Sequence, residues 1–279
     1  MRLALGDADY PEPLRALPDP PPLLWLRGDR ALLDRPCVAI VGTRRATAYA
    51  ERVTRQLASA LARAGACVVS GMARGVDACA HRGALDVGGA TCAVLGTGID
   101  VVYPKAHAAL QREIAAHGLL VSELAPANAA HGGSFPRRNR IIAALAQVTI
   151  VVEAGEKSGA LITAEHAQIL DRVVAAVPGP IDVPQARGSN LLLRDGAVII
   201  TSTSDVLTLC GLTPIARRAD VPEGSTERAL WDALGDGTTT LDALCTRTGL
   251  PAQEGMAALG LLEMRGLVEC GAGGELRRL

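Results

Sequence analysis

The stretch "CVAIVGTRRATAYAERVTRQLASALARAGACVVSG", residues 37–71, determines the fold class that we predict for this chain. It begins with the apolar run "CVAIVG". It continues into "AYAERVTRQLASALARAG", in which apolar residues recur three and four positions apart until Gly65. The next apolar run, "CVVSG", follows at once. A strand, a helix and a second strand in this order predict a parallel β-α-β unit.

The same pattern repeats through residues 37–210. The apolar runs are short and rich in β-branched residues, and they are continuous rather than alternating, which is typical of strands covered on both faces. We therefore predict an α/β domain with a doubly wound parallel sheet. The predicted strands lie in "CVAIVG" (37–42), "CVVSG" (67–71), "TCAVLG" (91–96), "LLVSEL" (119–124), "TIVVEA" (149–154), "VVAAVPG" (173–179) and "AVIITS" (197–202).

The two ends of the chain differ from this central part. Residues 1–36 are rich in proline, and we expect an extended, polyproline-like segment that packs on the main domain through "LLWL" at 23–26. Residues 211–223 are expected to form a linker. Residues 224–279 predict a helix, a helix-turn-helix and a hairpin with a glycine turn, which is the order of a winged-helix domain.

Composition narrows the class of protein. The net charge of −1 argues against a general binder of polyanions, although residues 36–210 carry 16 basic and 13 acidic residues. The seven cysteines include no C-x-x-C pair, so we expect reduced, buried thiols in a cytoplasmic protein and no metal site. No apolar run approaches the roughly 18–20 residues that a membrane helix needs, so we expect no membrane contact.

The turns after the predicted strands are candidate ligand sites, because open parallel sheets bind ligands beyond the carboxyl ends of their strands. Three of these turns place Arg or Lys beside glycine at the start of a helix, a combination that favours phosphate. Any one of them taken alone is better explained as a simple strand-to-helix turn. Their convergence on one edge of the sheet is what favours an anionic ligand. The three turns are "GTRR" (42–45), "SGMARG" (70–75) and "GEKSG" (155–159).

The first turn does not fit a nucleotide cofactor. A dinucleotide site requires G-x-G-x-x-G, whereas the chain has "GTRRAT", in which Arg44 and Arg45 occupy the space of the pyrophosphate. A Walker sequence, G-x-x-x-x-G-K-[ST], is absent too. We therefore expect no cofactor.

The stretch "HGGSFPRRNRII", residues 131–142, contains the chain's one phenylalanine, Phe135. We interpret it as a flexible loop in which Phe135 stacks on an unpaired base while the neighbouring arginines contact phosphates. A hydrophobic plug that holds the loop down is the alternative.

An enzyme is the main competing interpretation. Asp77 and His81 lie four residues apart on one helix face, where they would serve as a general acid and base or as metal ligands. Equally, Asp77 would cap its helix and His81 would fix a nearby loop through a hydrogen bond. No nucleophile with an adjacent base is recognisable, so we expect binding rather than catalysis.

These segments, in this order, resemble the DNA-processing protein A family (DprA, also called Smf). The matching stretches include "VGTRRAT", "SGMARGVDACAH", "GTGIDVVYP", "FPRRNRII" and "VVEAGEKSGALITA". The resemblance implies a Rossmann-like, non-catalytic protein that binds single-stranded DNA and protects it during natural transformation. It also implies a homodimer that delivers the strand to the RecA recombinase.

The resemblance also implies a set of DNA-binding residues. Arg44 and Lys157 would neutralise phosphates, Phe135 would stack on a base, and Ser70 and Ser158 would donate to phosphate oxygens. Asn139 would either join them or lock the loop internally. The full implied set is Arg44, Ser70, Gly71, Arg74, Phe135, Arg137, Asn139, Arg140, Lys157, Ser158 and Gly159.

The C-terminal domain and the fold leave two alternatives open. Residues 223–279 carry five basic and nine acidic residues, a net charge of −4, which favours contact with protein or weak assistance to DNA binding over firm binding of duplex DNA. A winged-helix transcription regulator is nevertheless one alternative. The other is a nucleotide-processing enzyme resembling the phosphoribohydrolases, although the P-G-G-x-G-T-x-x-E stretch of those enzymes is absent here.

Overall fold

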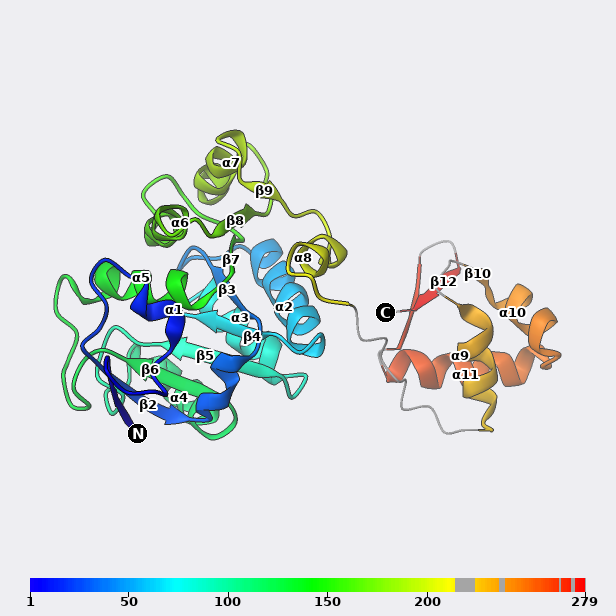
Figure 1. Cartoon of the computed structure of the whole chain (residues 1–279). Helices are drawn as coiled ribbons and strands as arrows, with labels where there is room; N and C mark the ends of the chain where they lie inside the picture. The colour runs from blue at the N-terminus through cyan, green and yellow to red at the C-terminus, as the bar shows by residue number, and fades with distance from the viewer. Residues whose placement is uncertain (214–223, 236–238, 266, 272–273, 279) are drawn as a thin grey trace. The chain divides into compact units, whose positions relative to one another are not determined.

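The computed structural model describes residues 1–213, 224–235, 239–265, 267–271 and 274–278. The chain divides into two compact units, Met1–Ile215 and Ala216–Leu279 (Figure 1). Most of the predicted linker, residues 214–223, lies outside the described residues. Each unit is described below by itself.

The first unit contains the parallel strands that the apolar runs predict. Each run becomes a short strand, and its polar or glycine-containing end becomes the turn that follows. The strands are β3 (Cys37–Val41), β4 (Cys67–Ser70), β5 (Ala90–Val94), β6 (Leu119–Ser122), β7 (Val148–Val151), β8 (Val173–Ala176) and β9 (Val198–Ile199). The α/β prediction with a doubly wound parallel sheet is confirmed.

The strands lie in the order β6-β5-β4-β3-β7-β8-β9. The chain therefore builds the sheet outward from β3 in one direction, returns to pair β7 with the other edge of β3, and continues in the opposite direction. In register, Ile40 of β3 lies opposite Ile150 of β7. The strand order reverses at this pair, which places a topological switch point between β3 and β7.

Helices cover both faces of the sheet, which is why the strands are apolar throughout (Figure 1). Side chains of β3 alternate between the faces. Val38 and Ile40 pack beneath α2 (Ala48–Arg63) and α3 (Val76–Leu85), and Ala39 and Val41 pack beneath α5 (Ser134–Leu145) and α6 (Gly159–Ile169). The helices of this unit that follow β3 are α2 (Ala48–Arg63), α3 (Val76–Leu85), α4 (Ala108–His117), α5 (Ser134–Leu145), α6 (Gly159–Ile169), α7 (Arg187–Arg194) and α8 (Thr203–Leu209). Short 3-10 turns occupy Lys105–His107 and Pro184–Ala186.

The N-terminal segment differs from the polyproline-like chain that its prolines suggest. It contributes two antiparallel strands, β1 (Arg2–Ala4) and β2 (Leu23–Gly28), and β2 pairs with the outer edge of β6. A short helix, α1 (Glu12–Arg15), and a 3-10 turn at Arg30–Asp34 complete the segment. Strand pairing prevails because it satisfies the backbone groups of β6 that would otherwise form an open edge, and it buries Leu24 and Leu26.

The second unit has the predicted winged-helix order. It consists of α9 (Thr226–Leu234), β10 (Thr239–Thr240), α10 (Leu241–Thr248), α11 (Ala252–Met264), β11 (Val268–Cys270) and β12 (Glu275–Arg278). The three strands pair antiparallel in the order β10-β12-β11. A small core of leucines, Val268 and Trp231 holds the unit together, and the guanidinium of Arg278 lies 4.5 Å from the centre of the Trp231 ring.

The packing of α2 on the sheet yields a stability prediction. Leu61 is fully buried in the core beneath α2, so Leu61→Ala is expected to lower the free energy of unfolding by about 2–5 kcal/mol. Gln56→Ala, at an exposed position of the same helix, is expected to stay within about 0.5 kcal/mol. Urea denaturation of the full chain measures both, and equal effects would contradict the packing of α2 described here.

Candidate nucleic-acid interface

A hollow of about 680 Å³ lies at the switch point, between the turn that follows β3 and the turn that precedes α6. In open α/β sheets this is where a crevice forms, because the connections from the two central strands lead to opposite faces. We call it the first hollow. Its lining includes Thr43, Arg44 and Arg45 from the first turn and Lys157, Ser158 and Gly159 from the second.

A second hollow, of about 820 Å³, lies beyond the ends of β4 and β5. Its lining comes from the turn after β4, the segment after β5 and the residues around Tyr103. The two hollows share a wall, because Arg44, Arg45, Ala73, Phe135 and Arg138 line both of them. We call the two hollows together the groove.

The start of α6 contributes polar groups to the first hollow. Ser158 is the N-cap of this helix, and its hydroxyl oxygen accepts a hydrogen bond from the N–H of Ala160 at 3.3 Å. The first turn of α6 thus faces the hollow with the positive end of its dipole, and the exposed Lys157 lies just before it. This end of the hollow is suited to an anion.

Phe135 lies in the first turn of α5, so its placement in a flexible loop is wrong. The ring is half-buried in the wall between the hollows. Its centre is 5.0 Å from that of the Tyr103 ring, with the two planes tilted by 37°. The guanidinium of Arg44 lies 5.6 Å from the ring centre. Phe135 is therefore carried by α5, is held in place by its contacts with Tyr103 and Arg44, and remains open to the groove.

The helical position of Phe135 decides which neighbouring side chains face the groove. Residues three, four and seven positions along a helix share one face. Arg138, Asn139 and Ile142 accordingly line the first hollow together with Phe135, and Arg137 and Arg140 do not. The family resemblance implied Arg137 and Arg140 as site residues and did not include Arg138. The spacing from Phe135 is the signal that would have found it.

Arg138 is a buried cation in the shared wall. Its Nη1 donates hydrogen bonds to the carbonyl oxygens of Gly71, at 2.7 Å, and Val94, and its Nε donates to Asn139 Oδ1 at 3.3 Å. Burial lowers the pKa of this guanidinium to about 10. Gly71 is required here, because a Cβ at this position would overlap the guanidinium.

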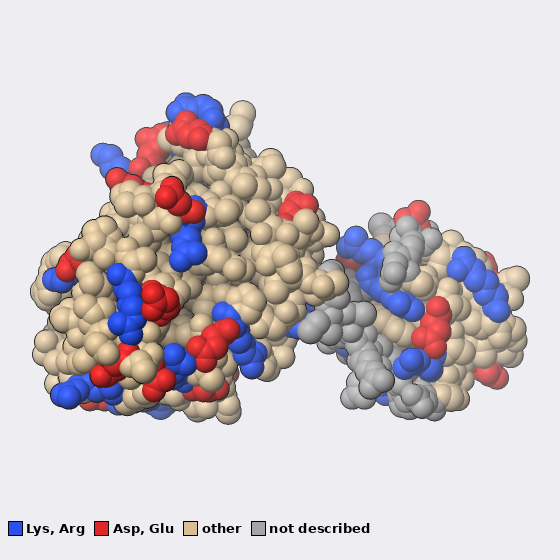
Figure 2. All heavy atoms as spheres, in the orientation of Figure 1, with Lys and Arg blue, Asp and Glu red and all other residues tan. Residues whose placement is uncertain are grey.

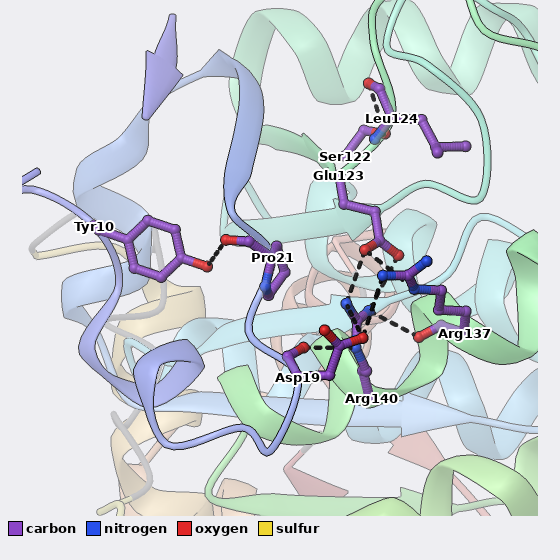
Figure 3. A network of polar contacts seen from close by, with 8 residues as sticks. All are labelled: Tyr10, Asp19, Pro21, Ser122, Glu123, Leu124, Arg137 and Arg140. Atoms are coloured by element: carbon purple, nitrogen blue, oxygen red, sulfur yellow. Dashed lines mark hydrogen bonds and ion pairs between the residues drawn. The ribbon is translucent and has the colours of Figure 1, made fainter. Parts of the chain in front are cut away.

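Arg137 and Arg140 are outside the lining of both hollows, and their guanidinium groups lie beside Glu123 and Asp19 of the N-terminal segment (Figure 3). Arg140 is buried and forms a two-pronged ion pair with Glu123, at 2.8 and 3.0 Å, and it also donates to the carbonyl oxygen of Asp19 at 3.2 Å. Arg137 is 56% exposed and contacts the carboxylates of Asp19 at 3.2 Å and Glu123 at 3.7 Å. These contacts fasten α5 to the rest of the unit, and the placement of both arginines outside the two hollows argues against the DNA contacts predicted for them.

Ser70 and Asn139 also have internal partners. Ser70 is the last residue of β4, is fully buried, and donates its hydroxyl proton to the Ile40 carbonyl at 2.6 Å, so it does not reach a phosphate. The Asn139 side chain donates to the Gly159 carbonyl at 3.1 Å, which ties α5 to the start of α6. Asn139 thus follows the second of its two predicted roles. Among the other predicted residues, Gly71 and Arg74 line the second hollow.

Asp77 and His81 do not form an acid–base pair. Asp77 accepts a hydrogen bond from the N–H of Ala73 at 3.3 Å. Burial raises the pKa of its carboxyl group, and the positive charge of nearby Arg138 partly offsets this rise. His81 Nδ1 lies 2.7 Å from Thr91 Oγ1. Because that oxygen donates its own proton to Val68, Nδ1 carries the imidazole proton. Burial lowers the pKa of His81 to about 3. The two side chains thus have separate partners: Asp77 bonds the turn before α3, and His81 bonds Thr91 of β5.

The groove is positive although the surface is mixed. On the face shown in Figure 2, basic and acidic side chains of the sheet unit are interspersed. Among the residues lining the groove, by contrast, Asp77 is the one carboxylate, and it lines only the first hollow. The cationic side chains in the lining of the two hollows are Arg44, Arg45, Arg74, Lys105, Arg138 and Lys157.

Two further observations limit the chemistry of the described residues. They contain no group of three or more His, Cys, Asp or Glu side chains placed to hold a metal ion. None of the helices described is both long and apolar enough to span a membrane.

Comparison with known proteins identifies the family. The sequence model of the family described as DNA recombination-mediator protein A matches residues 2–211, which contain β1 to β9 and all of the groove. The chain belongs to the DNA recombination-mediator protein A family. A separate sequence model, that of the DprA winged helix domain, matches residues 214–274. The resemblance to DprA and the winged-helix prediction are both confirmed.

Individual family members share much of the chain. Protein Smf of Escherichia coli K12 is 36% identical over 282 residues, covering 96% of this chain and 75% of that protein. The DNA processing protein DprA of Streptococcus pneumoniae is 42% identical over 205 residues, covering 72% of this chain and 71% of that protein.

Two solved structures of family members resemble this chain. The X-ray structure of DprA from Streptococcus pneumoniae has a TM-score of 0.72 and 40% identity, covering 75% of this chain and 73% of that one. DprA from Helicobacter pylori, whose structure describes its mode of single-stranded DNA binding, has a TM-score of 0.68 and 36% identity. The match covers 75% of this chain and 94% of that one.

The ion pairs that fasten α5 yield a prediction about stability. Arg140→Met is expected to lower the free energy of unfolding by about 3 kcal/mol, because Glu123 is left buried with its charge poorly compensated. The matched change Arg137→Met is expected to cost less than about 1 kcal/mol, since Arg137 is largely exposed. Denaturant unfolding of both variants measures the difference, and a larger loss for Arg137→Met would contradict this account of the α5 contacts.

The buried His81 yields a prediction about pH. The folded imidazole has a pKa of about 3 against 6.5 for a free one, so the unfolded chain takes up the proton first as the pH falls. His81 therefore contributes stability that is present above pH 6.5 and lost as the pH falls toward 3. Between pH 7 and 5 the wild type should lose about 2 kcal/mol more unfolding free energy than His81→Gln. Parallel urea titrations at the two pH values test this, and equal losses would refute the neutral imidazole.

Proposed function

We propose that this chain binds single-stranded DNA in the groove and acts by binding rather than by catalysis. The observation that carries the proposal is the meeting of Arg44, Phe135 and Lys157 in the lining of the first hollow. They come from three segments that are far apart in the sequence. Together they offer two exposed cations for phosphates and one ring for a base.

The geometry favours an unpaired strand over a duplex. Phe135 is half-buried in a wall between two hollows, so a base must leave its own helix to stack on the ring. Stacking of this kind contributes about 1–3 kcal/mol per base and accepts any base, since all have an aromatic face. The cations of the groove supply the sequence-independent attraction to the backbone. The family member from Helicobacter pylori, described for its single-stranded DNA binding mode, supports the same ligand.

The groove does not bring together side chains that would make it an active site. Asp77, the acidic side chain in its lining, is engaged with the backbone of the turn that precedes α3. His81 is buried against Thr91 and is outside the lining of both hollows. The lining of the groove therefore contains no histidine that could act with Asp77 as an acid–base pair on a bound ligand. The groove offers charge and stacking, which are sufficient for binding.

The physiological role we propose rests on the family. The bound strand would be protected and delivered to the RecA recombinase during natural transformation, by a homodimer working in the cytoplasm. The support is membership in a family described as recombination mediators and the match to DNA processing proteins of Streptococcus pneumoniae and Bacillus subtilis. Co-purification with RecA and a sedimentation measurement of the mass in solution test these two parts.

For the winged-helix unit we propose contact with protein rather than recognition of duplex DNA. The second helix of its helix-turn-helix, α11, exposes Glu254 and Glu263 with one arginine, Arg265. Its exposed surface also includes Met256 and Met264. Duplex binding depends on neutralising phosphates, which this surface is poorly charged to do.

The groove yields a prediction for the salt dependence of binding. Arg44→Gln and Lys157→Gln should each weaken binding to an oligothymidine and reduce the slope of log K against log salt by about 0.7. Arg137→Gln, a matched loss of charge outside the groove, should leave that slope unchanged. Fluorescence anisotropy at several salt concentrations measures the slopes.

Two results would refute the proposed site. One is unchanged affinity in both Arg44→Gln and Lys157→Gln. The other is a larger loss for Arg137→Gln than for either of them. A duplex of the same length serves as the comparison ligand, and binding as tight as that of the single strand would contradict the role given to Phe135.

A further inference from the structure

The second hollow carries a ring and cations of its own, which the binding of one nucleotide at the first hollow does not use. Tyr103, Arg74 and Lys105 line the second hollow and are absent from the lining of the first. They come from two different segments, the turn after β4 and the segment between β5 and α4. The second hollow therefore adds one aromatic ring and two cations to the residues that it shares with the first.

Tyr103 is available to a ligand. The residue is 45% exposed, and no hydrogen bond of its hydroxyl group is found within the described part of the chain. Its ring contacts that of Phe135 at 5.0 Å with a tilt of 37°. Because the rings are tilted rather than stacked flat, the Phe135 ring does not cover the whole Tyr103 face.

The rest of the hollow suits a base. Met72 and Leu95 are buried apolar residues in its lining, and Gly96 brings the backbone close to the Phe135 ring. A Cβ at position 96 would lie 2.5 Å from that ring, so glycine is needed here. Apolar and aromatic surfaces of this kind bury a flat, uncharged group rather than a phosphate.

The edge of the hollow suits a phosphate. Arg74 and Lys105 are exposed, and the described residues place no carboxylate within ion-pair distance of either. The lining of the second hollow includes no Asp or Glu. Two cations without local compensation beside an apolar hollow form a site for an amphipathic anion, of which a nucleotide is one.

We propose that the second hollow binds a second nucleotide of the same strand, with its base against Tyr103 and its phosphate beside Arg74 and Lys105. The inference rests on the proposed binding of single-stranded DNA to the groove. Phe135 and Arg138 form the wall between the two nucleotides, because both residues line both hollows. The phosphates then run from Lys157 past Arg44 to Arg74 and Lys105.

This assignment changes the size of the ligand. A ligand that fills the groove has at least two adjacent unpaired nucleotides, and a mononucleotide occupies only one hollow. The two bases lie on opposite sides of one wall, so they cannot remain stacked on each other when both are bound. The groove thus selects a strand that is flexible as well as unpaired.

Photocross-linking tests the position of the second base. The full chain is mixed with oligothymidines that carry a single 5-iodouracil at successive positions, irradiated, and mapped by mass spectrometry. The expected result is cross-linking of Tyr103 and Phe135, each to a different position of the strand. Cross-links confined to Phe135 would overturn the proposal.

Affinity tests the contribution of the ring. Tyr103→Leu is expected to weaken binding of a long oligothymidine about tenfold, as loss of one stacked base predicts. Tyr103→Phe keeps the ring and should remain within about twofold. Tyr49→Leu, which removes an exposed tyrosine outside both hollows, is the matched control and should bind like the wild type. Arg74→Gln and Lys105→Gln should each reduce the salt slope by about 0.7.

The outcomes separate this proposal from the proposed function. If Tyr103→Leu binds like the wild type while Arg44→Gln and Lys157→Gln lose affinity, the second nucleotide site is refuted and the first stands. Weaker binding by Tyr103→Leu without any cross-link to Tyr103 also refutes it, since the ring would then only support Phe135. If the wild type fails to bind single strands at all, both proposals fall.

Discussion

The groove depends on one buried guanidinium. Arg138 joins α5 to the carboxyl ends of two strands, through the carbonyl oxygen of Gly71 after β4 and that of Val94 at the end of β5. A charged group taken out of water is costly unless it is hydrogen-bonded, so this side chain has little freedom to move. Because Phe135 lies one turn earlier on the same helix face, fixing Arg138 also fixes the ring. The wall between the two hollows therefore has a defined shape.

The opposite side of α5 is held by a different set of charges. Arg140 pairs with Glu123 after β6 and contacts Asp19 in the N-terminal segment, so the helix is fastened from both sides (Figure 3). The N-terminal segment in turn is secured by strand pairing with β6 and by Tyr10, whose hydroxyl donates to the Pro21 carbonyl at 2.7 Å. This segment contributes to the groove without lining it, because it supports the helix that carries Phe135.

Charge is distributed so that a nearly neutral chain carries a positive groove. The acidic residues near α5, Asp19 and Glu123, are engaged by Arg137 and Arg140 on the side away from the hollows. The groove lining contains six cationic side chains and one carboxyl group, that of Asp77 in the first hollow. Net charge is therefore a poor guide to this protein's ligand, since the field at a concave site depends on local groups.

The sequence by itself determined the parallel sheet and its helical layers, because alternating apolar runs and helix-period segments are local patterns. It also determined the turns of Arg44 and Lys157, because the turns after parallel strands meet at one edge of the sheet. It did not determine that "SFPRRNRII" is helical. Pro136 suggested a loop, yet proline is tolerated in the first turn of a helix. Tertiary structure decided the rest: the helix face selected Arg138 over Arg137 and Arg140, and pairing with β3 buried the Ser70 hydroxyl. The direction of a side chain depends on partners that are distant in sequence, and those are fixed only when the chain packs.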